Sequence, residues 1–495
     1  MTMKRRLFLQ ASVGAAALWP ARMLFADGVG PLSDMAAKSL TGGELTLRGV
    51  DVQDLAAGMR GQVLVGGQAG YEEARHVWNG MFDKHPAVIA RCASPSDVMR
   101  AVTFAREHQL LTAVRCGGHS LSGKSACDGG IVIDLSPMQG VRVDADAKIA
   151  RVEGGALLRH LDRETRAFGL VTTAGTVSHT GVGGLTLGGG FGRVGRRFGL
   201  ACDNVQAVDI VTADGRLITA NAKHNPDLLW AVRGGGGNFG VVTSFEFRLH
   251  AMDPMVLAGD IAWPMAQGRE VMHFIAEFSA NAPDELNLDL SLVPGGPDGK
   301  GMVVAEACWS GDKSQGERVL QPLRTFGKPM FDHIAATSYV GLQASGDEMN
   351  AAGQRVYVKA GFFSELTTAN IDLIVETAQQ AVANGAVIAM AQGGGAIGRA
   401  AVDSAAYPNR RAKFWVMVVK AWQDPAQDRE NIGHVRAAWK ALEPFSDGFY
   451  VNAMSEDEYK RVAANYGGNY QRLQQAKKKY DPTNQFRLNA NVLPG

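Results

Sequence analysis

Residues 115–120 read Arg-Cys-Gly-Gly-His-Ser and directly follow the apolar, strand-like run Leu-Leu-Thr-Ala-Val at residues 110–114. Glycine lets the backbone come close to a phosphate or a planar ring, because it carries no side chain. The arrangement predicts a tight loop at the end of a strand, with the imidazole of His119 on that loop. Taken alone, the segment fits an ordinary turn as well as a cofactor loop.

Two further segments indicate what kind of loop this is. A second glycine-dense loop lies at residues 181–192, and residues 227–242 read Asp-Leu-Leu-Trp-Ala-Val-Arg-Gly-Gly-Gly-Gly-Asn-Phe-Gly-Val-Val. In this order they resemble the flavoenzymes of the vanillyl-alcohol-oxidase superfamily, most closely its berberine-bridge-enzyme-like branch. Residues 465–489 are similar to the C-terminal segment of that branch. The resemblance implies an α+β fold: a PCMH-type FAD-binding domain of two α/β subdomains, and a substrate domain of antiparallel sheet covered by helices.

The pattern along the chain is consistent with that organisation. From residue 88 short β-rich runs alternate with helical ones, and Ser94 before Pro95 predicts a helix cap. Beyond residue 250 longer alternating apolar runs predict an antiparallel sheet, with helices over residues 268–279 and 368–383. We expect a signal segment at 1–26, an FAD-binding domain at 80–250, a substrate domain at 251–455, and a C-terminal segment at 456–495 that returns to the FAD domain.

The resemblance implies FAD as cofactor, bonded through His119 to the 8α carbon of the flavin. Many relatives add a second bond from a cysteine four residues before the Gly-Val-Gly-Gly loop, where this chain has Val177. We therefore expect one covalent bond only. Backbone amides of the glycine loops would hold the pyrophosphate. Further residues expected to bind the cofactor are Arg115, Cys116, Gly117, Gly118, Ser120, Gly175, Gly181, Gly183, Gly184, Gly240, Val242 and Asn489.

Tyr450 is the leading candidate for the catalytic base, since Tyr450-Val451-Asn452 resembles the family's Tyr-x-Asn segment. A phenol has a pKa near 10, so a cation or hydrogen-bond donors would have to favour phenolate. Gln392 is similar to a family glutamine, but Met390 stands where some relatives carry a tuning lysine. A core role for Tyr450 therefore remains open. His179 is the alternative base, and a structural hydrogen bond is its other interpretation.

The predicted reaction is oxidation of a C–OH group of a small metabolite or carbohydrate, with hydride transfer to flavin N5 and a dioxygen or quinone-type acceptor. Two alternatives stay open: oxidation of a C–N bond, as in relatives acting on hydroxylated nicotine, and a flavin-carrying electron-transfer protein. The 50 basic and 49 acidic residues leave a net charge of +1, which argues against nucleic acid as a partner. Five scattered cysteines without CxxC spacing predict neither a metal site nor a disulfide framework.

The N-terminus predicts export. Lys4-Arg5-Arg6-Leu7-Phe8-Leu9 precedes a short apolar run at residues 11–19, a charged start and apolar stretch typical of a signal peptide. The run is shorter than the about 20 residues that span a bilayer. The arginine pair resembles the twin-arginine class, so the twin-arginine translocase and a periplasmic or secreted location are expected; a plain Sec signal is the alternative.

Overall fold

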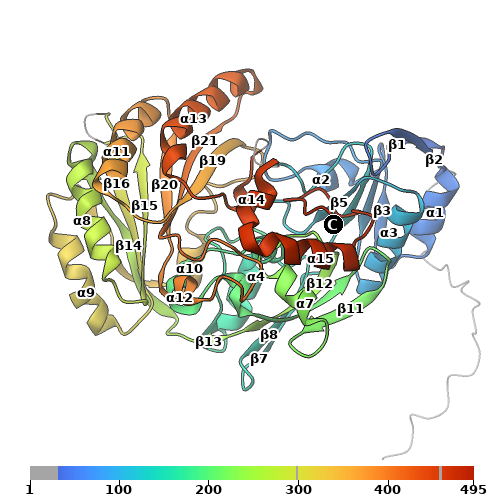
Figure 1. Ribbon diagram of the computed structural model, residues 1–495, viewed down its shortest axis with the longest axis horizontal. Helices are drawn as coiled ribbons and strands as arrows, with labels where there is room; N and C mark the ends of the chain where they lie inside the picture. Colours follow the sequence, from blue (N-terminus) through green and yellow to red (C-terminus); the bar gives the residue numbers. More distant parts are fainter. Residues whose placement is uncertain (1–31, 297–298, 456–459) are drawn as a thin grey trace, which may run out of the picture.

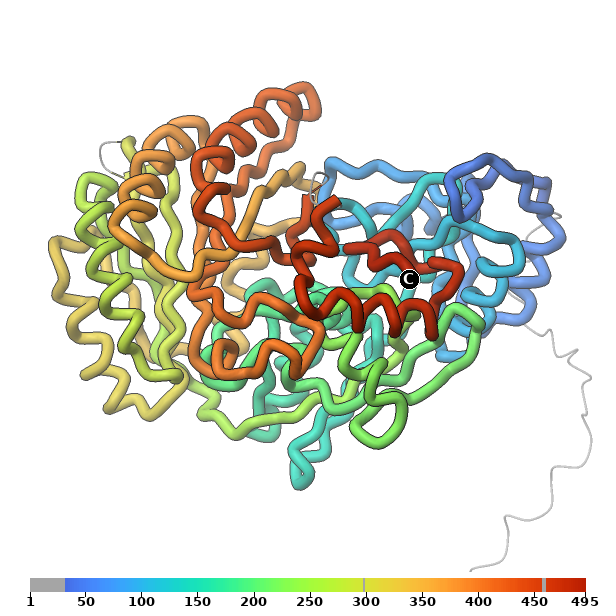
Figure 2. The backbone as a smooth tube through the Cα atoms, viewed as in Figure 1, coloured from blue at the N-terminus to red at the C-terminus, as the bar shows by residue number. Residues whose placement is uncertain are grey.

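The structure, a computed structural model, describes residues 32–296, 299–455 and 460–495. The predicted signal segment at 1–26 lies outside these residues. Figure 1 shows a large sheet backed by helices on one side of the molecule and smaller sheets with their own helices on the other. The C-terminal helices lie over the half that contains the smaller sheets (Figure 2). The end of the chain therefore returns to the half that the earlier part of the chain forms.

The first small sheet has the order β3-β4-β6-β5, and β4 and β5 both run parallel to β6. Helix α3 connects β4 to β5, and the hydroxyl of Ser94 accepts a hydrogen bond from the Asp97 amide at its start, as predicted. Because β5 ends at Arg115, the His119 loop begins at the sheet edge. The elements of this part are β1 (Met35–Lys38), β2 (Glu44–Leu47), α1 (Gly49–Ala57), β3 (Gln62–Leu64), α2 (Tyr71–Arg75), β4 (Val88–Arg91), α3 (Pro95–Glu107), β5 (Thr112–Arg115) and β6 (Ile131–Asp134).

The second small sheet is antiparallel, with the order β11-β10-β12-β8-β7. Residues Val205–Val211 and Leu217–Asn221 form a hairpin in this sheet, with Ile210 opposite Ile218. The segment 181–192, predicted as a loop, is helical in part. Residues Val182–Leu187 form the short helix α5, whose Val182 and Leu185 pack into the core. The elements here are β7 (Val141–Asp144), β8 (Ile149–Glu153), α4 (Leu158–Arg166), β9 (Leu170–Val171), α5, α6 (Gly195–Phe198), β10 (Val205–Val211), β11 (Leu217–Asn221), α7 (Pro226–Val232), β12 (Val241–Arg248) and β13 (His250–Ala251).

The large sheet is antiparallel, with the order β17-β14-β16-β15-β20-β21-β19, and β18 also pairs with β14. Helices α8, α9, α11 and α13 cover one face, and together they enclose the largest hydrophobic core. This confirms an antiparallel sheet covered by helices. The elements are β14 (Met255–Pro264), α8 (Gly268–Ala280), β15 (Leu286–Val293), β16 (Met302–Trp309), α9 (Lys313–Thr325), β17 (Phe331–Asp332), β18 (Ala335–Ser338), α10 (Tyr339–Ala344), β19 (Arg355–Phe363), α11 (Thr368–Ala383), β20 (Val387–Gln392), α12 (Gly395–Arg399), β21 (Phe414–Trp422) and α13 (Asp428–Leu442).

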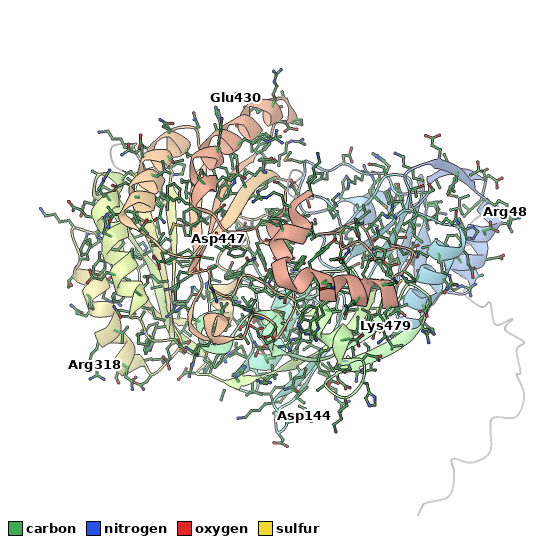
Figure 3. All side chains as sticks on the ribbon, in the orientation of Figure 1. Arg48, Asp144, Arg318, Glu430, Asp447 and Lys479 are labelled. Carbon is green, nitrogen blue, oxygen red and sulfur yellow. The ribbon has the colours of Figure 1, made fainter. Side chains whose placement is uncertain are left out.

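The surface is charged, and Arg48, Asp144, Arg318 and Glu430 project from the periphery of the molecule (Figure 3). Among the described residues, no helix is both long and apolar enough to cross a membrane. All five cysteines are free thiols.

The C-terminal segment, with helices α14 (Val462–Tyr466) and α15 (Tyr470–Tyr480), is anchored by a buried lysine. The ammonium group of Lys477 donates to the carboxylate of Asp481 at 2.7 Å and to the carbonyls of Asn238 and Phe486 at 2.8 and 2.9 Å. Both Lys477 and Asp481 are fully buried. The lysine therefore ties the C-terminal segment to the glycine-rich stretch before β12.

We expect Lys477→Met to destabilise the protein by about 3–5 kcal/mol, because it leaves the buried Asp481 carboxylate without its cation. Chemical unfolding of the purified variant measures this loss. The exposed neighbour Lys478 supplies the control, since Lys478→Met should change stability by no more than about 0.5 kcal/mol. Equal stability of both variants would contradict the anchoring role.

Candidate active site

A cavity of about 600 Å³ lies between the glycine-rich loops and the face of the large sheet that the helices leave uncovered. Its wall includes parts of residues 116–125, 175–184 and 236–242, strands β15, β20 and β21, and the C-terminal segment. All of the predicted site residues except Arg115 and His179 line this cavity. Segments far apart in the sequence therefore meet where a cofactor and a substrate would have to meet.

The two glycine loops pack backbone against backbone. A Cβ atom at Gly181 would lie 2.4 Å from the amide nitrogen of Gly117, a distance that no side chain tolerates. Gly118 has a φ of +70°, which favours glycine. In contrast, a Cβ at Gly184 would meet nothing within 4 Å, so this backbone borders open space in the cavity wall. The loops thus offer bare backbone to a large, flat or phosphate-bearing ligand.

The cavity fits a flavin nucleotide. Its volume falls within the range of about 300–1,000 Å³ that is typical of cofactor and ligand sites. Asn489 lines it, and the side-chain oxygen of this residue is buried without a hydrogen-bond partner, whereas its amide nitrogen donates to the Phe486 carbonyl. A buried polar atom without a partner costs free energy, so a bound ligand that donates to it would stabilise the site.

His119 stands in the cavity wall between two aromatic rings. Its imidazole stacks on the indole of Trp78, with ring centroids 4.8 Å apart and planes within 17°. On its other side Nε2 lies 2.6 Å from Nδ1 of His179. Burial, and to a lesser degree the neighbouring His179, lowers the pKa of His119 to about 3. The ring is therefore neutral near pH 7 and holds a lone pair on one nitrogen.

Two predicted residues lie elsewhere than expected. The guanidinium of Arg115 donates to the Ala74 carbonyl, and Arg115 does not line the cavity. His179 lies behind His119 rather than in the wall. Because His179 does not line the cavity, the structure does not favour it as the acceptor of a substrate proton. Burial raises the pKa of the Cys116 thiol, which does line the cavity, to about 11.

Tyr450 presents its hydroxyl at the junction of the two halves. The oxygen accepts hydrogen bonds from the Gly190 amide at 2.8 Å and from Nδ2 of Asn452 at 2.9 Å. Burial raises the pKa of the phenol to about 12 although both donors favour the charged form. The phenol therefore keeps its proton near neutral pH. With both acceptor positions used, its O–H is left to donate.

No lysine stands two residues before Gln392 to favour the phenolate form of Tyr450, because Met390 occupies that position. Met390 is 1% exposed and belongs to the core under the helices, whereas the small side chains of Ala389 and Ala391 alternate with it. The amide of Gln392 donates to Oδ1 of Asp289 at 2.8 Å, and its side-chain oxygen accepts from the Leu288 amide at 2.8 Å. Gln392 thus fixes the position of β15 and of a carboxylate on that strand.

That carboxylate, with its neighbour Glu306, was absent from the sequence-based prediction. Asp289 on β15 lies opposite Glu306 on β16, and both line the cavity. Burial, reinforced by the charge of Glu306, raises the pKa of Asp289 to about 6. Glu306 is itself neutralised by Arg193, whose guanidinium donates to Oε1 at 2.6–2.7 Å.

A signal for Asp289 does exist in the sequence. Residues 286–292 read Leu-Asn-Leu-Asp-Leu-Ser-Leu, a strict alternation in which every second residue is polar. The leucines enter the core under the helices, so Asn287, Asp289 and Ser291 face the cavity. The alternation predicts a polar face, but only the folded sheet shows that this face borders the glycine loops.

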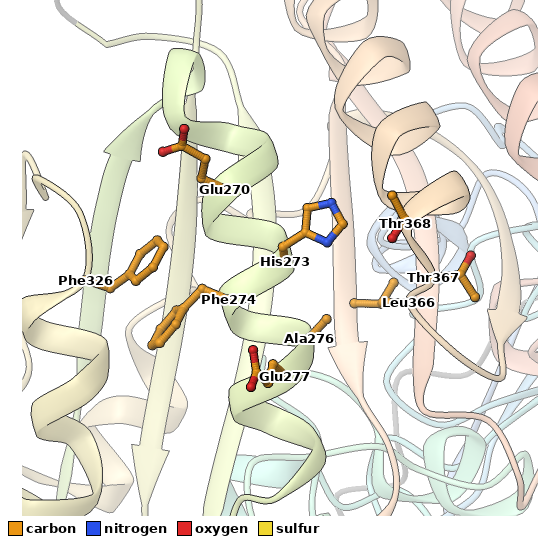
Figure 4. Close-up of a pocket in the computed structure, with 9 residues that line it drawn as sticks. All are labelled: Glu270, His273, Phe274, Ala276, Glu277, Phe326, Leu366, Thr367 and Thr368. Atoms are coloured by element: carbon orange, nitrogen blue, oxygen red, sulfur yellow. The ribbon is translucent and has the colours of Figure 1, made fainter.

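A second depression, of about 760 Å³, lies on the opposite side of the large sheet (Figure 4). It is bordered by Glu270, His273 and Glu277 of α8 and by Thr367 and Thr368 at the start of α11. None of the predicted site residues lines it. Among the described part of the chain, no group of three or more His, Cys, Asp or Glu side chains is placed to share a metal ion.

Comparison with known proteins decides the family. Residues 86–221 match the FAD-binding domain model and residues 449–493 match the model described as berberine and berberine like. An FAD-linked oxidoreductase of Dictyostelium discoideum is 32% identical over 424 residues, covering 84% of this chain and 91% of that relative. The chain belongs to the berberine-bridge-enzyme-like family of FAD-linked oxidoreductases.

Relatives within this family act on different substrates. (R)-6-Hydroxynicotine oxidase of Paenarthrobacter nicotinovorans is 30% identical, covering 88% of this chain and 97% of that enzyme. The crystal structure of 6-hydroxy-D-nicotine oxidase from Arthrobacter nicotinovorans superposes with a TM-score of 0.80, at 28% identity, over 88% of this chain and 98% of that one. A xylooligosaccharide oxidase of Thermothelomyces thermophilus is 37% identical over 215 residues, which cover 41% of this chain and 42% of that enzyme.

The two family matches include several of the predicted site residues. The FAD-binding match contains the His119 loop and helix α5, and the second match contains Tyr450 and Asn489. As a member of the berberine-bridge-enzyme-like family, the chain is an FAD-dependent enzyme.

Proposed function

We propose that the protein is an exported oxidoreductase that carries FAD on His119 alone and oxidises a C–OH group of a small metabolite or carbohydrate. One observation carries the proposal: the neutral imidazole of His119 and the carboxylate of Asp289 line the same cavity. The imidazole supplies a nucleophile for attachment, and the carboxylate supplies a proton acceptor. Val177, at the position of the second link in doubly bonded relatives, lines the cavity and cannot form such a bond.

Bound at the glycine loops, FAD accepts a hydride from a substrate carbon. The protein must remove the hydroxyl proton of the alcohol, and Asp289 is the cavity group best suited to do so. Its pKa of about 6 leaves it ionised at pH 7 while keeping it basic enough to accept a proton. The Gln392 amide holds its Oδ1 in place. Tyr450, which keeps its own proton, would instead donate a hydrogen bond to the substrate oxygen.

Tyr450→Phe should slow anaerobic flavin reduction by the substrate about tenfold, the effect of losing one hydrogen bond of about 1.4 kcal/mol. The change also leaves the Gly190 amide and the Asn452 side chain without their shared acceptor. Stopped-flow absorbance of the flavin measures the rate. An unchanged rate would remove Tyr450 from substrate binding and leave it as part of the aromatic core around Trp415.

Oxidation of a C–N bond is the second candidate. The wall formed by β15 and β16 presents the carboxylate of Asp289, which would attract an amine, whereas the charge of Glu306 is paired with Arg193. An amine in its neutral form also needs no strong base, and this agrees with Met390 standing where some relatives have a lysine. The hydroxynicotine oxidases show that family members act on such compounds.

An anaerobic substrate panel separates these reactions. Purified protein is mixed with sugars, simple alcohols and cyclic amines in the absence of oxygen, and the flavin absorbance near its visible maximum is followed. Bleaching by alcohols or sugars supports the leading proposal, and bleaching by amines alone supports the second candidate. If no compound reduces the flavin while chemical reductants do, the electron-transfer alternative takes their place. Hydrogen peroxide release on readmitting air then distinguishes dioxygen from a quinone-type acceptor.

Export by the twin-arginine translocase is supported by Arg5 and Arg6 before an apolar run. Replacing both by lysine should keep the protein in the cytoplasm, because the pair identifies the signal to that translocase. Cell fractionation and immunoblotting measure its location. Continued export of the double-lysine variant would favour a Sec signal instead.

A further inference from the structure

His179 is the one predicted catalytic residue that the cavity does not include, and it is held in a defined environment. A segment between α10 and β19 packs against it: Nε2 of His179 lies 3.4 Å from the main-chain oxygen of Asp347. The Asp347 carboxylate accepts hydrogen bonds from the amide and hydroxyl of Ser178 at 2.8 and 2.5 Å. The indole of Trp78, which stacks on His119, donates to the Asn350 carbonyl at 2.6 Å. One segment of the substrate half therefore supports both neighbours of His119.

This geometry fixes which nitrogen of each ring carries the proton. A carbonyl oxygen can only accept, so Nε2 of His179 must be the protonated nitrogen. In the neutral ring Nδ1 of His179 is then an acceptor, and Nε2 of His119 at 2.6 Å must donate to it. The remaining nitrogen of His119, Nδ1, consequently holds the lone pair. The Asp347 carbonyl thus sets the tautomer of His119 through His179.

We propose that His179 is a positioning residue for cofactor attachment: it holds His119 in the Nδ1-nucleophilic tautomer and accepts the Nε2 proton as the histidyl–flavin bond forms. The proposal rests on the attachment of FAD to His119 proposed above. It gives His179 a role that needs no contact with substrate, in agreement with its place behind the cavity wall.

The step balances as follows. One bond forms between Nδ1 of His119 and the 8α carbon of the flavin, and one C–H bond at that carbon and the Nε2–H bond of His119 break. The two electrons released remain in the flavin, and dioxygen removes them with two protons to give hydrogen peroxide. His179 receives the Nε2 proton at its Nδ1 and releases it to solvent. Without an acceptor at this position, the imidazole would have to become cationic in a buried site, which the low pKa of His119 disfavours.

The test follows attachment itself. Full-length apoprotein from riboflavin-starved cells is mixed with FAD in air, and acid-stable flavin on the polypeptide is measured with time by fluorescence in denaturing gels and by intact mass. His179→Leu keeps side-chain volume but has no acceptor, so attachment should slow by about 10²-fold, the lower end of the contribution of a positioned proton acceptor. His179→Asn retains an oxygen near the position of Nδ1 and should recover most of the wild-type rate.

The controls separate this role from folding and from the proposed function. Non-covalent FAD binding and thermal unfolding should be similar in both His179 variants. Attachment at the wild-type rate in His179→Leu overturns the proposal, and so does an asparagine variant as slow as the leucine variant. Should His179→Leu not accumulate as folded protein, slow attachment in a folded His179→Asn decides against the proposal. Acid-stable flavin in His119→Ala would overturn the proposed function instead, because His119 would then not be the link.

Discussion

His119→Ala should yield a protein from which acid releases all of the flavin. In the wild type, a precipitate formed with acid should stay yellow, because a bond from His119 survives unfolding. The variant keeps the glycine loops that border the cavity, so it should still bind FAD without a covalent bond. The expected change is complete, from full retention of flavin in the pellet to full release into the supernatant.

This experiment also tests the number of bonds. Val177 lines the cavity where doubly bonded relatives have cysteine, and the Cys116 thiol, also in the wall, has its pKa raised to about 11 and is therefore a poor nucleophile. His224→Ala, at an exposed histidine outside the cavity, is the matched control and should retain its flavin. Flavin left on the His119→Ala polypeptide would reveal a second link, and a colourless wild-type pellet would exclude covalent attachment.

Asp289→Asn should slow flavin reduction by substrate about 10²- to 10⁴-fold, the range expected for loss of a general base. The change keeps the shape of the side chain and an oxygen that accepts from the Gln392 amide, but it removes the negative charge. Anaerobic stopped-flow measurement of the rate tests this. The wild-type rate should also fall as the pH drops below about 6, because a base acts only when deprotonated and the pKa of Asp289 is about 6.

The acidic limb of that pH profile should be absent in Asp289→Asn. Ser291→Ala is the matched control, since Ser291 lies on the same strand and lines the same cavity but does not titrate. It should keep both the rate and the pH dependence within a few fold. A wild-type rate in Asp289→Asn, or an unchanged limb near pH 6, would contradict a role for this carboxylate and return attention to Tyr450.

Much of the site was predictable because it consists of local sequence. Glycine at Gly117 and Gly181 is required by a close backbone contact, and loops of this kind leave a recognisable pattern. The positions of Arg115 and His179 were less predictable. Each lies at the start of one of the two glycine loops, yet Arg115 contacts Ala74 and His179 contacts Asp347, and both contacts depend on distant parts of the chain.

By itself, the sequence determined the family, the α+β class and the glycine loops that border the cavity, because short-range patterns of glycine and alternating apolar residues encode local backbone shape. The tertiary structure alone decided which polar groups face that cavity. Asp289 reaches it only because β15 pairs with β16 and β20 in one sheet, and His119 receives its tautomer from a carbonyl far along the chain. Proton transfer depends on distances of about 3 Å between such groups, and long-range packing sets those distances.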